Sequence, residues 1–262
     1  MKREWLTGPI LFFILTAALF VTWAALEPAT LVNAFDRGGY SPFELATLPF
    51  FAALVPLAWW KCPFDGSPRR RRVLALMVSV VAVMAIVKEL DLHNALLHLA
   101  YPDCVQASGS LVPGKFFKPD GRALTGTPFK LRVLTNGAVP PGMKALVVGY
   151  FAAFFGTFAA GFAYLLPRWV KGVFRLEPAS WAWGCCGGAG VLVQVADRLP
   201  SWLDHAHGLD KHAEGGVSAA SSLCTCLEEG GEMMLAVFAI LTILLAHRAL
   251  RRRAGQPGNA CR

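Results

Sequence analysis

The chain has 262 residues, of which 55% are hydrophobic and only 16% are charged, and it contains 18 Phe and 8 Trp. Soluble domains usually carry charge on about a quarter of their residues, and disordered chains have few aromatic residues. The composition therefore excludes disorder and predicts an integral membrane protein. The formal net charge of +8 is what membrane orientation and attraction to anionic headgroups would produce.

Six apolar runs are long enough to cross a hydrocarbon layer of about 30 Å, which takes roughly 20 helical residues. Proline in the second run predicts a kink, and glycine in the fifth allows helices to pack closely in lipid. We expect a single all-α domain over residues 1–262, a bundle of six transmembrane helices. The runs are Trp5 to Leu26, Pro42 to Trp60, Val73 to about Leu92, Lys144 to Leu166, Ala179 to about Val195, and about Leu227 to Ala249.

Basic residues gather in the connections that six spans place on one side of the membrane. Because positively charged loops stay in the cytoplasm, both termini are expected to be cytoplasmic, in a bacterial inner membrane. The groups are Lys2 and Arg3, Lys61 with Arg69 to Arg72, Arg168 with Lys171 and Arg175, and Arg248 with Arg251 to Arg253 and Arg262.

Two consequences of this charge pattern concern partners and processing. The basic residues flank spans and form no groove with interleaved aromatics, so the expected partner is the lipid bilayer and not nucleic acid. The first run is interpreted as an uncleaved anchor. A cleaved signal peptide is the alternative, and it leaves the remaining topology unchanged.

The connection between the third and fourth runs, residues 101–142, is predicted to form a periplasmic loop or cap. It contains the turn signals Pro119-Asp120-Gly121 and Asn136-Gly137 around an alternating run from Phe129 to Leu134, which is typical of a hairpin. Cysteines on this oxidising side allow two expectations. One is a disulfide from Cys104 to Cys224 or Cys226, and the other is a set of buried thiols.

Ionisable residues occur near the outer ends of the third, fifth and sixth runs. Glu89 lies 17 residues beyond Arg72, and Glu232 lies 16 residues before Arg248, so both carboxylates are expected about 25 Å above the inner boundary. Asp197 on the fifth run falls near the same level. Three helices are therefore predicted to bring acidic groups together near the periplasmic interface.

The spacing of these residues favours a cation site. Glu89 and His93 are four residues apart, as are Glu228 and Glu232, and residues at this spacing share a helical face. Carboxylates and imidazoles from neighbouring helices ligate metals in this way. The predicted ligands are Glu89, His93, Asp197, Glu229 and Glu232, supported by Lys88, Asp91, Arg198 and Glu228.

Three interpretations of this acidic region remain open. Its six carboxylates have only Lys88 and Arg198 as basic neighbours in sequence. Surplus negative charge near a low-dielectric boundary must face water, take up protons or hold a cation. The region could thus be a structural network on the two bases, a divalent metal site for Zn, Fe, Mn or Cu with a hydrolytic role through metal-bound water, or a site for protons or substrate.

A second, weaker cluster of metal ligands is His205, His207 and His212. Imidazole suits zinc, copper, iron or nickel, but the spacing is looser than in usual tetrahedral zinc sites, and a solvated loop is the alternative. The sequence has no phosphate loop, zinc-protease, serine-hydrolase or c-type haem motif. No reaction is therefore predicted.

The acidic motifs resemble those of a group of small bacterial multi-pass inner-membrane proteins without an assigned activity. The resemblance covers roughly residues 73–250 and departs at the histidine-rich stretch from His205 to His212. It implies that the motif positions form one site, and it implies no chemistry. The matching elements are Glu89-Leu90-Asp91-x-His93, Lys115-Phe116-Phe117, Val139-Pro140-Pro141, Asp197-Arg198 and Leu227-Glu228-Glu229-x-x-Glu232.

Three functions from different classes follow. The first is a membrane-embedded site for a divalent cation. The second is a non-catalytic subunit or assembly factor of a larger membrane complex, which the helix-packing glycines suggest. The third is a transporter or proton relay, for which the spans offer few polar residues.

Overall fold

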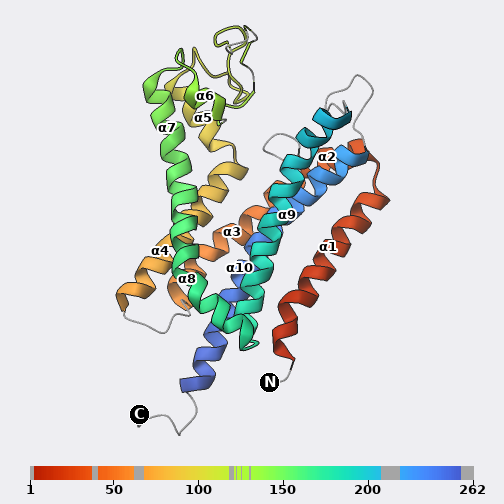
Figure 1. Cartoon of the computed structure of the whole chain (residues 1–262), viewed down its shortest axis with the longest axis vertical. Helices are drawn as coiled ribbons and strands as arrows, with labels where there is room; N and C mark the ends of the chain where they lie inside the picture. The colour runs from red at the N-terminus through yellow and green to blue at the C-terminus, as the bar shows by residue number, and fades with distance from the viewer. Residues whose placement is uncertain are drawn as a thin grey trace.

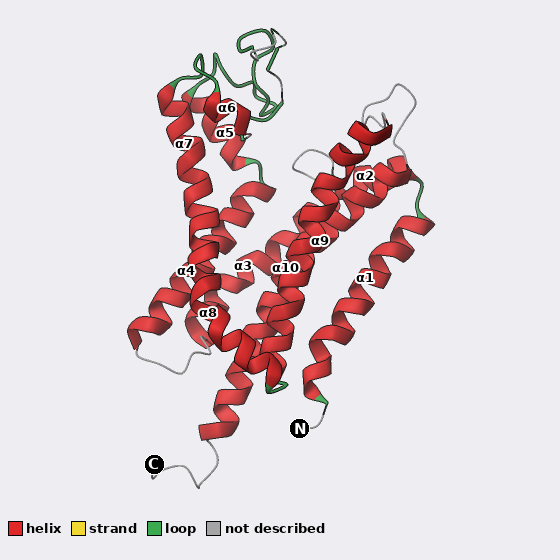
Figure 2. Cartoon of the chain, in the orientation of Figure 1, coloured by secondary structure: helices red, strands yellow, loops and turns green. Residues whose placement is uncertain are grey.

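The computed structural model describes residues 3–36, 41–61, 68–117, 121, 123–124, 126–129, 131–207 and 219–254. The regular secondary structure of these residues is helical, with loops in the connections (Figure 2), and their β pairing amounts to two isolated bridges, Val105 with Leu111 and Phe117 with Ala123. The prediction of an all-α protein is confirmed.

The ten α-helices of the described residues are numbered as in Figure 1. A 3-10 turn, η1 (Glu4–Leu6), precedes the first helix, and a π-helical segment, η2 (Ala152–Gly156), joins the seventh to the eighth. The helices are α1 (Thr7–Ala25), α2 (Pro28–Phe35), α3 (Pro42–Lys61), α4 (Pro68–Glu89), α5 (Leu92–Ala100), α6 (Leu131–Thr135), α7 (Pro141–Phe151), α8 (Thr157–Phe174), α9 (Pro178–His207) and α10 (Ala219–Ala254).

Four helical segments of the described chain are long and apolar enough to cross a membrane: Glu4–Ala25, Pro42–Lys61, Pro141–Phe174 and Ala219–Arg252. Helices α4 and α5 form a fifth if they are taken as one broken span, since they meet at a bend of 73°. The glycine-rich α9 does not belong to this set. The chain is thus a membrane protein with four or five such spans in its described part, and the count of six stays a prediction.

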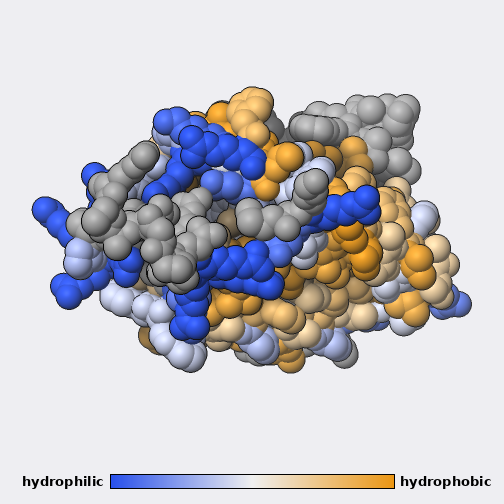
Figure 3. Space-filling view, turned by 90° about the horizontal axis from the view of Figure 1, so that it is seen from below, coloured by the Kyte–Doolittle hydropathy of each residue, from blue (hydrophilic) through white to orange (hydrophobic). Residues whose placement is uncertain are grey.

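Helix α10 lies at the centre of the bundle and packs against α9, α3, α2 and α1, while α4 packs against α3 and α8. The start of α1 and the end of α10 lie at the same end of the molecule, opposite α5 and α6 (Figure 1). Two hydrogen bonds of 2.9 and 3.0 Å from the Arg252 guanidinium to the Glu4 carboxylate join them there. Hydrophilic residues gather on this end of the molecule beside extensive hydrophobic surface (Figure 3).

The break between α4 and α5 has a local cause. Asp91 adopts a left-handed conformation with φ of 50°, which aspartate tolerates better than most residues. Its backbone N–H donates to the Lys88 carbonyl at 2.9 Å, and its carboxylate accepts a 3.1 Å hydrogen bond from Asn94. Helix α4 therefore ends at Glu89. The expectation that Glu89 and His93 share one helical face is wrong, because the bend lies between them.

The described part of residues 101–142 forms a cap over α5 and α7 (Figure 1). A buried cluster that includes Leu97, Val105, Phe116 and Val133 holds the cap together. The alternating run predicted as a strand contributes the short helix α6 instead. A helical turn buries Val133 and packs the adjacent Leu134 against the same cluster, whereas a strand would point successive side chains to opposite faces.

The cysteines do not form the predicted disulfide. Cys104, Cys224 and Cys226 are all reduced and buried. Cys104 belongs to the cluster of the cap, whereas the Cys226 thiol on α10 lies 3.5 Å from the carbonyl oxygen of Leu19 on α1. The alternative of buried thiols is the one that the structure shows.

Close helix packing fixes the position of α10 where its acidic residues lie. A Cβ added to Gly231 would lie 2.7 Å from a methyl carbon of Val193 and 3.5 Å from the carbonyl oxygen of Ala189, both on α9. Glycine at this position allows the two helices to approach within van der Waals contact of each other's backbones. The glycines between Glu229 and Glu232 therefore have a packing role.

Candidate functional site

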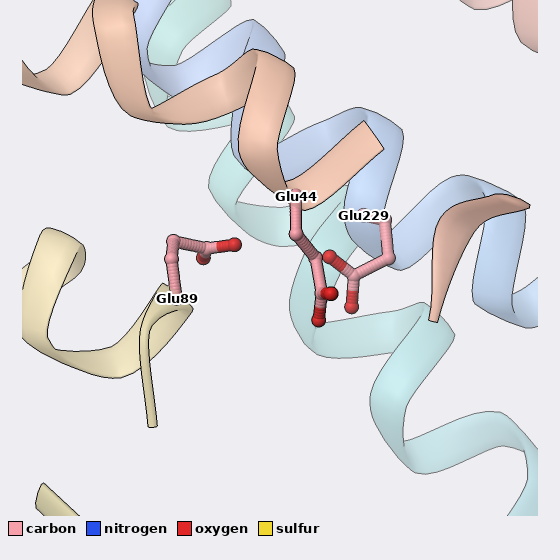
Figure 4. Close-up of side chains that lie close together, drawn as sticks. All are labelled: Glu44, Glu89 and Glu229. Carbon is pink, nitrogen blue, oxygen red and sulfur yellow. The ribbon is translucent and has the colours of Figure 1, made fainter. Parts of the chain in front are cut away.

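Three carboxylates from three different helices converge next to the break between α4 and α5. Glu44 comes from the first turn of α3, Glu89 ends α4, and Glu229 lies on α10 (Figure 4). One carboxylate oxygen of each lies within 4.8 Å of the other two. The three residues are only 8%, 5% and 9% exposed. Among the described residues, no other group of three potential metal ligands meets this distance.

Glu44 owes its orientation to the start of α3. The backbone N–H of Ser41 donates to its Oε2 at 2.7 Å, and the backbone N–H of Glu44 donates to the Ser41 hydroxyl at 3.0 Å. This reciprocal pair is a capping box, in which Ser and Glu three residues apart satisfy the open donors of a helix start. The Ser41 hydroxyl in turn donates to the Phe35 carbonyl at 2.8 Å. The carboxylate is thereby held before any ligand arrives.

Glu89 carries the least satisfied polar atom of the site. Its Oε1 is buried and has no hydrogen-bond partner, and its carboxylate points toward Glu44 and Glu229 (Figure 4). The Lys88 ammonium lies 3.6 Å from the same oxygen, beyond hydrogen-bond distance. Because the carbonyl end of a helix carries partial negative charge, the end of α4 adds to the negative potential here.

A fourth carboxylate, Glu232, borders the group and is paired with Lys88. The Lys88 Nζ donates to both oxygens of Glu232, at 2.5 and 2.6 Å. The side chain of Lys88 is 46% exposed, whereas that of Glu232 is 12% exposed. One lysine thus compensates one of four acidic groups, and a formal surplus of negative charge remains around Glu44, Glu89 and Glu229.

His93 lies outside the carboxylate group. Its ring stacks on Tyr150 with centroids 5.3 Å apart and meets the edge of Phe129 at 4.6 Å. Its Nδ1 lies 3.3 Å from the Val87 carbonyl oxygen. These contacts make His93 part of the aromatic packing between α5, α7 and the cap.

The other predicted residues are not brought into the group. The Asp197 side chain is 48% exposed and its Oδ2 lies 3.5 Å from the Nε of Arg198. Glu228 is not one of the three clustered carboxylates. Asp91 lies at the break between α4 and α5, where its carboxylate accepts a hydrogen bond from Asn94. His205 and His207 lie on α9, but their side chains fall outside the described residues, as does all of His212.

Sequence reasoning missed Glu44, although two signals for it were present. Glu44 is the one acidic residue in the second apolar run, and Ser41-Pro42-Phe43-Glu44 has the spacing of a capping box at a helix start. A capping box explains a glutamate by itself, so the pattern gives no hint of a shared site. Only the crossing of α3 over α4 and α10 brings Glu44 next to Glu89 and Glu229.

Comparison of the chain with protein-family models, with curated proteins and with solved structures finds no match. The function is therefore inferred from the geometry of the carboxylate group.

Proposed function

We propose that this protein binds a hard divalent cation within the membrane through Glu44, Glu89 and Glu229. The observation that carries the proposal is the convergence of three buried carboxylates from three helices, one of which has an oxygen without a hydrogen bond. Carboxylates are almost never buried in this number unless a cation, a proton or an ion pair compensates them. Lys88 supplies one positive charge, and a divalent cation would supply two more.

The chemistry of the ligands favours magnesium, calcium or manganese. All three candidate groups are carboxylates, and hard cations prefer oxygen ligands. The sequence led us to expect zinc, iron, manganese or copper, with His93 among the predicted ligands. Since His93 packs against Tyr150 and Phe129, nitrogen ligation is not part of the proposal.

The proposal also gives the cation an energetic role. Uncompensated charges in a low-dielectric interior cost several kcal/mol each. A cation that binds the folded state and not the unfolded state stabilises the fold by mass action. We therefore expect the melting temperature of the protein in detergent to rise with the concentration of the cation.

The site is proposed to open toward the periplasmic side of a bacterial inner membrane. The carboxylates lie at the end of α4 that leads into α5 and the cap, and the exposed arginines Arg69 to Arg72 lie at its beginning. Arginine-rich helix ends mark the cytoplasmic side. This polarity supports a periplasmic position for the cap.

Metal analysis of the purified protein tests the proposal. Protein prepared without chelator and equilibrated with Mg²⁺, Ca²⁺ or Mn²⁺ is expected to retain one of these metals at about one ion per chain. Glu89→Gln and Glu229→Gln should each abolish retention, because each removes a charged ligand from a site of three. Asp197→Asn and Glu228→Gln are matched controls, since each removes one acidic charge from outside the group.

Two results would contradict the proposal. One is wild-type protein that retains none of the three metals, and the other is retention that falls equally in the control variants. In the first case, protons or water compensate the carboxylates.

A second candidate, cation transport, is favoured by the broken span formed by α4 and α5. In transporters, ends of interrupted helices near the bilayer midplane coordinate the transported ion, and here Glu89 is the last residue before the interruption. Uptake of Mn²⁺ into proteoliposomes distinguishes the two functions. Uptake that is lost in Glu89→Gln supports transport, whereas tight binding without uptake supports a fixed site.

A further inference from the structure

We infer that Lys88 is a built-in competitor of the bound cation: it occupies both carboxylate oxygens of Glu232 and thereby lowers the affinity of the site. The inference rests on the proposed cation site and adds to it the residue that regulates its occupancy.

Glu232 has the position of a fourth ligand. It lies three residues after Glu229 on α10, and residues at this spacing are neighbours on one helical face. Its carboxylate is engaged on both oxygens by the Lys88 Nζ, at 2.5 and 2.6 Å. The ammonium thus takes the place on Glu232 that a metal ion would otherwise share.

Lys88 also acts on the candidate ligands directly. Its Nζ lies 3.6 Å from Glu89 Oε1, the buried oxygen that has no hydrogen bond. A positive charge this close to a ligand atom repels an incoming cation, and the repulsion is strong where water is scarce. Lys88 and Glu89 thus form an ion pair, but this oxygen still has no hydrogen-bond donor.

Lys88 has a more exposed side chain than the two carboxylates that it contacts. The Lys88 side chain is 46% exposed, compared with 3% for Glu89 and 12% for Glu232. Lysine has a flexible four-carbon stem, so its ammonium can change partners without a change in the backbone. The affinity of the site is therefore set by the competition between Lys88 and the cation for Glu232.

Mn²⁺ titration of four purified proteins tests the inference, with free Mn²⁺ followed by electron paramagnetic resonance. The proteins are wild type, Lys88→Met, Lys88→Arg and the double variant Lys88→Met with Glu232→Gln. Lys88→Met is expected to lower the dissociation constant by about tenfold or more, because it removes a nearby charge and releases a ligand. Lys88→Arg should bind like wild type. The double variant should bind more weakly than Lys88→Met, because the released ligand is gone.

The outcomes separate this inference from the proposed function. If neither wild type nor Lys88→Met binds Mn²⁺, the proposed cation site itself is wrong. If wild type binds and Lys88→Met binds equally or more weakly, the cation site stands and the competition is wrong. If Lys88→Met does not fold, Lys88→Gln replaces it: this variant removes the charge but keeps a hydrogen-bond donor for Glu232, so a smaller gain in affinity is expected, and affinity equal to or weaker than wild type overturns the inference.

Discussion

Glu44 combines two roles at the scale of a single residue. Its Oε2 accepts a hydrogen bond from the backbone of Ser41, so the carboxylate is fixed by the capping box of α3. The same carboxylate lies in the group with Glu89 and Glu229. A ligand that is held by helix capping loses little conformational entropy on binding a metal, which makes Ser41 a positioning residue for the site.

Removal of the Ser41 hydroxyl tests this link. Ser41→Ala deletes the hydroxyl that accepts from the Glu44 N–H and donates to the Phe35 carbonyl, but it keeps the Ser41 backbone N–H that donates to the Glu44 carboxylate. It is expected to cost about 1 kcal/mol of stability, with weaker Mn²⁺ binding because the capping box that orients Glu44 keeps only one of its two hydrogen bonds. Thermal unfolding and Mn²⁺ titration measure the two effects. Thr22→Ala is the control, since the Thr22 hydroxyl also donates to a backbone carbonyl, that of Ala18, and lies on α1, which contributes no carboxylate to the group. Mn²⁺ affinity that is unchanged in Ser41→Ala would contradict the link.

His93 provides a second test at this scale, because sequence spacing predicted it as a ligand. Its ring packs against Tyr150 and Phe129, outside the carboxylate group. His93→Phe should therefore keep Mn²⁺ affinity within about twofold of wild type and leave folding intact, since the aromatic contacts are conserved in kind. A loss of affinity comparable to that of Glu89→Gln would show that His93 ligates the cation after all.

The residues of the site were predictable to different degrees. Charged residues within apolar runs are rare and stand out, which is why Lys88, Glu89, Glu229 and Glu232 were all singled out. The grouping of Glu89 with His93 assumed a continuous helix, and the left-handed Asp91 breaks it. Glu44 joins Glu89 and Glu229 only because of the way in which α3 crosses α4 and α10. Residue spacing along the chain does not predict how helices cross.

Helices α1 and α9 pack closely against each other at Gly8. A Cβ added to Gly8 would lie 3.0 Å from the Cα of Ala182, so a side chain there would force the two backbones apart. A Cβ added to Gly187 on α9 would meet nothing within 4 Å. Gly8 is therefore needed for close helix packing, whereas Gly187 is not, although both lie in apolar helices.

Alanine substitution at these glycines is expected to give opposite results. Gly8→Ala should lower the melting temperature, since Ala182 backbone atoms cannot move aside as a flexible side chain would. Gly187→Ala should leave it unchanged or raise it, because alanine is the better helix former by up to about 1 kcal/mol. Thermal unfolding in detergent measures both. A larger loss for Gly187→Ala than for Gly8→Ala would contradict the packing described here.

Long apolar runs made the main helices predictable, and local backbone chemistry made their interruptions unpredictable. The first, second, fourth and sixth runs correspond to the four helical segments that can span a membrane. The third run continues across the bend at Asp91 into α5, and the expected strand in the cap is the helix α6. Both differences occur where a few polar residues determine the backbone conformation, which hydropathy does not predict.

In the molecule as a whole, the start of α1 and the end of α10 lie at the same end. Helix α1 begins and α10 ends at one end, where Glu4 and Arg252 pair, and the cap lies at the other (Figure 1). The pair is exposed and adds little stability, so the arrangement comes from the packing of α1 and α10. If both ends lie on one side of a membrane, the number of crossings is even, as the prediction of six spans requires; the described residues contain four or five candidate spans.

Site-directed labelling tests this topology. A fluorescent protein fused to the C-terminus is expected to fluoresce in the cytoplasm, and Ser108→Cys in the exposed part of the cap should react with a membrane-impermeant thiol reagent in intact cells. The buried Cys104 should stay unlabelled and serves as an internal control. Labelling of Ser108→Cys only after cell lysis would place the cap in the cytoplasm.

The most direct test of the cation site is a crystal structure of the protein soaked in Mn²⁺, with data collected at the manganese absorption edge. The account predicts one strong anomalous peak at about 2.0–2.5 Å from carboxylate oxygens of Glu44, Glu89 and Glu229, and its loss in Glu229→Gln. Carboxylates that remain in place with no anomalous peak between them, at saturating Mn²⁺, would contradict it.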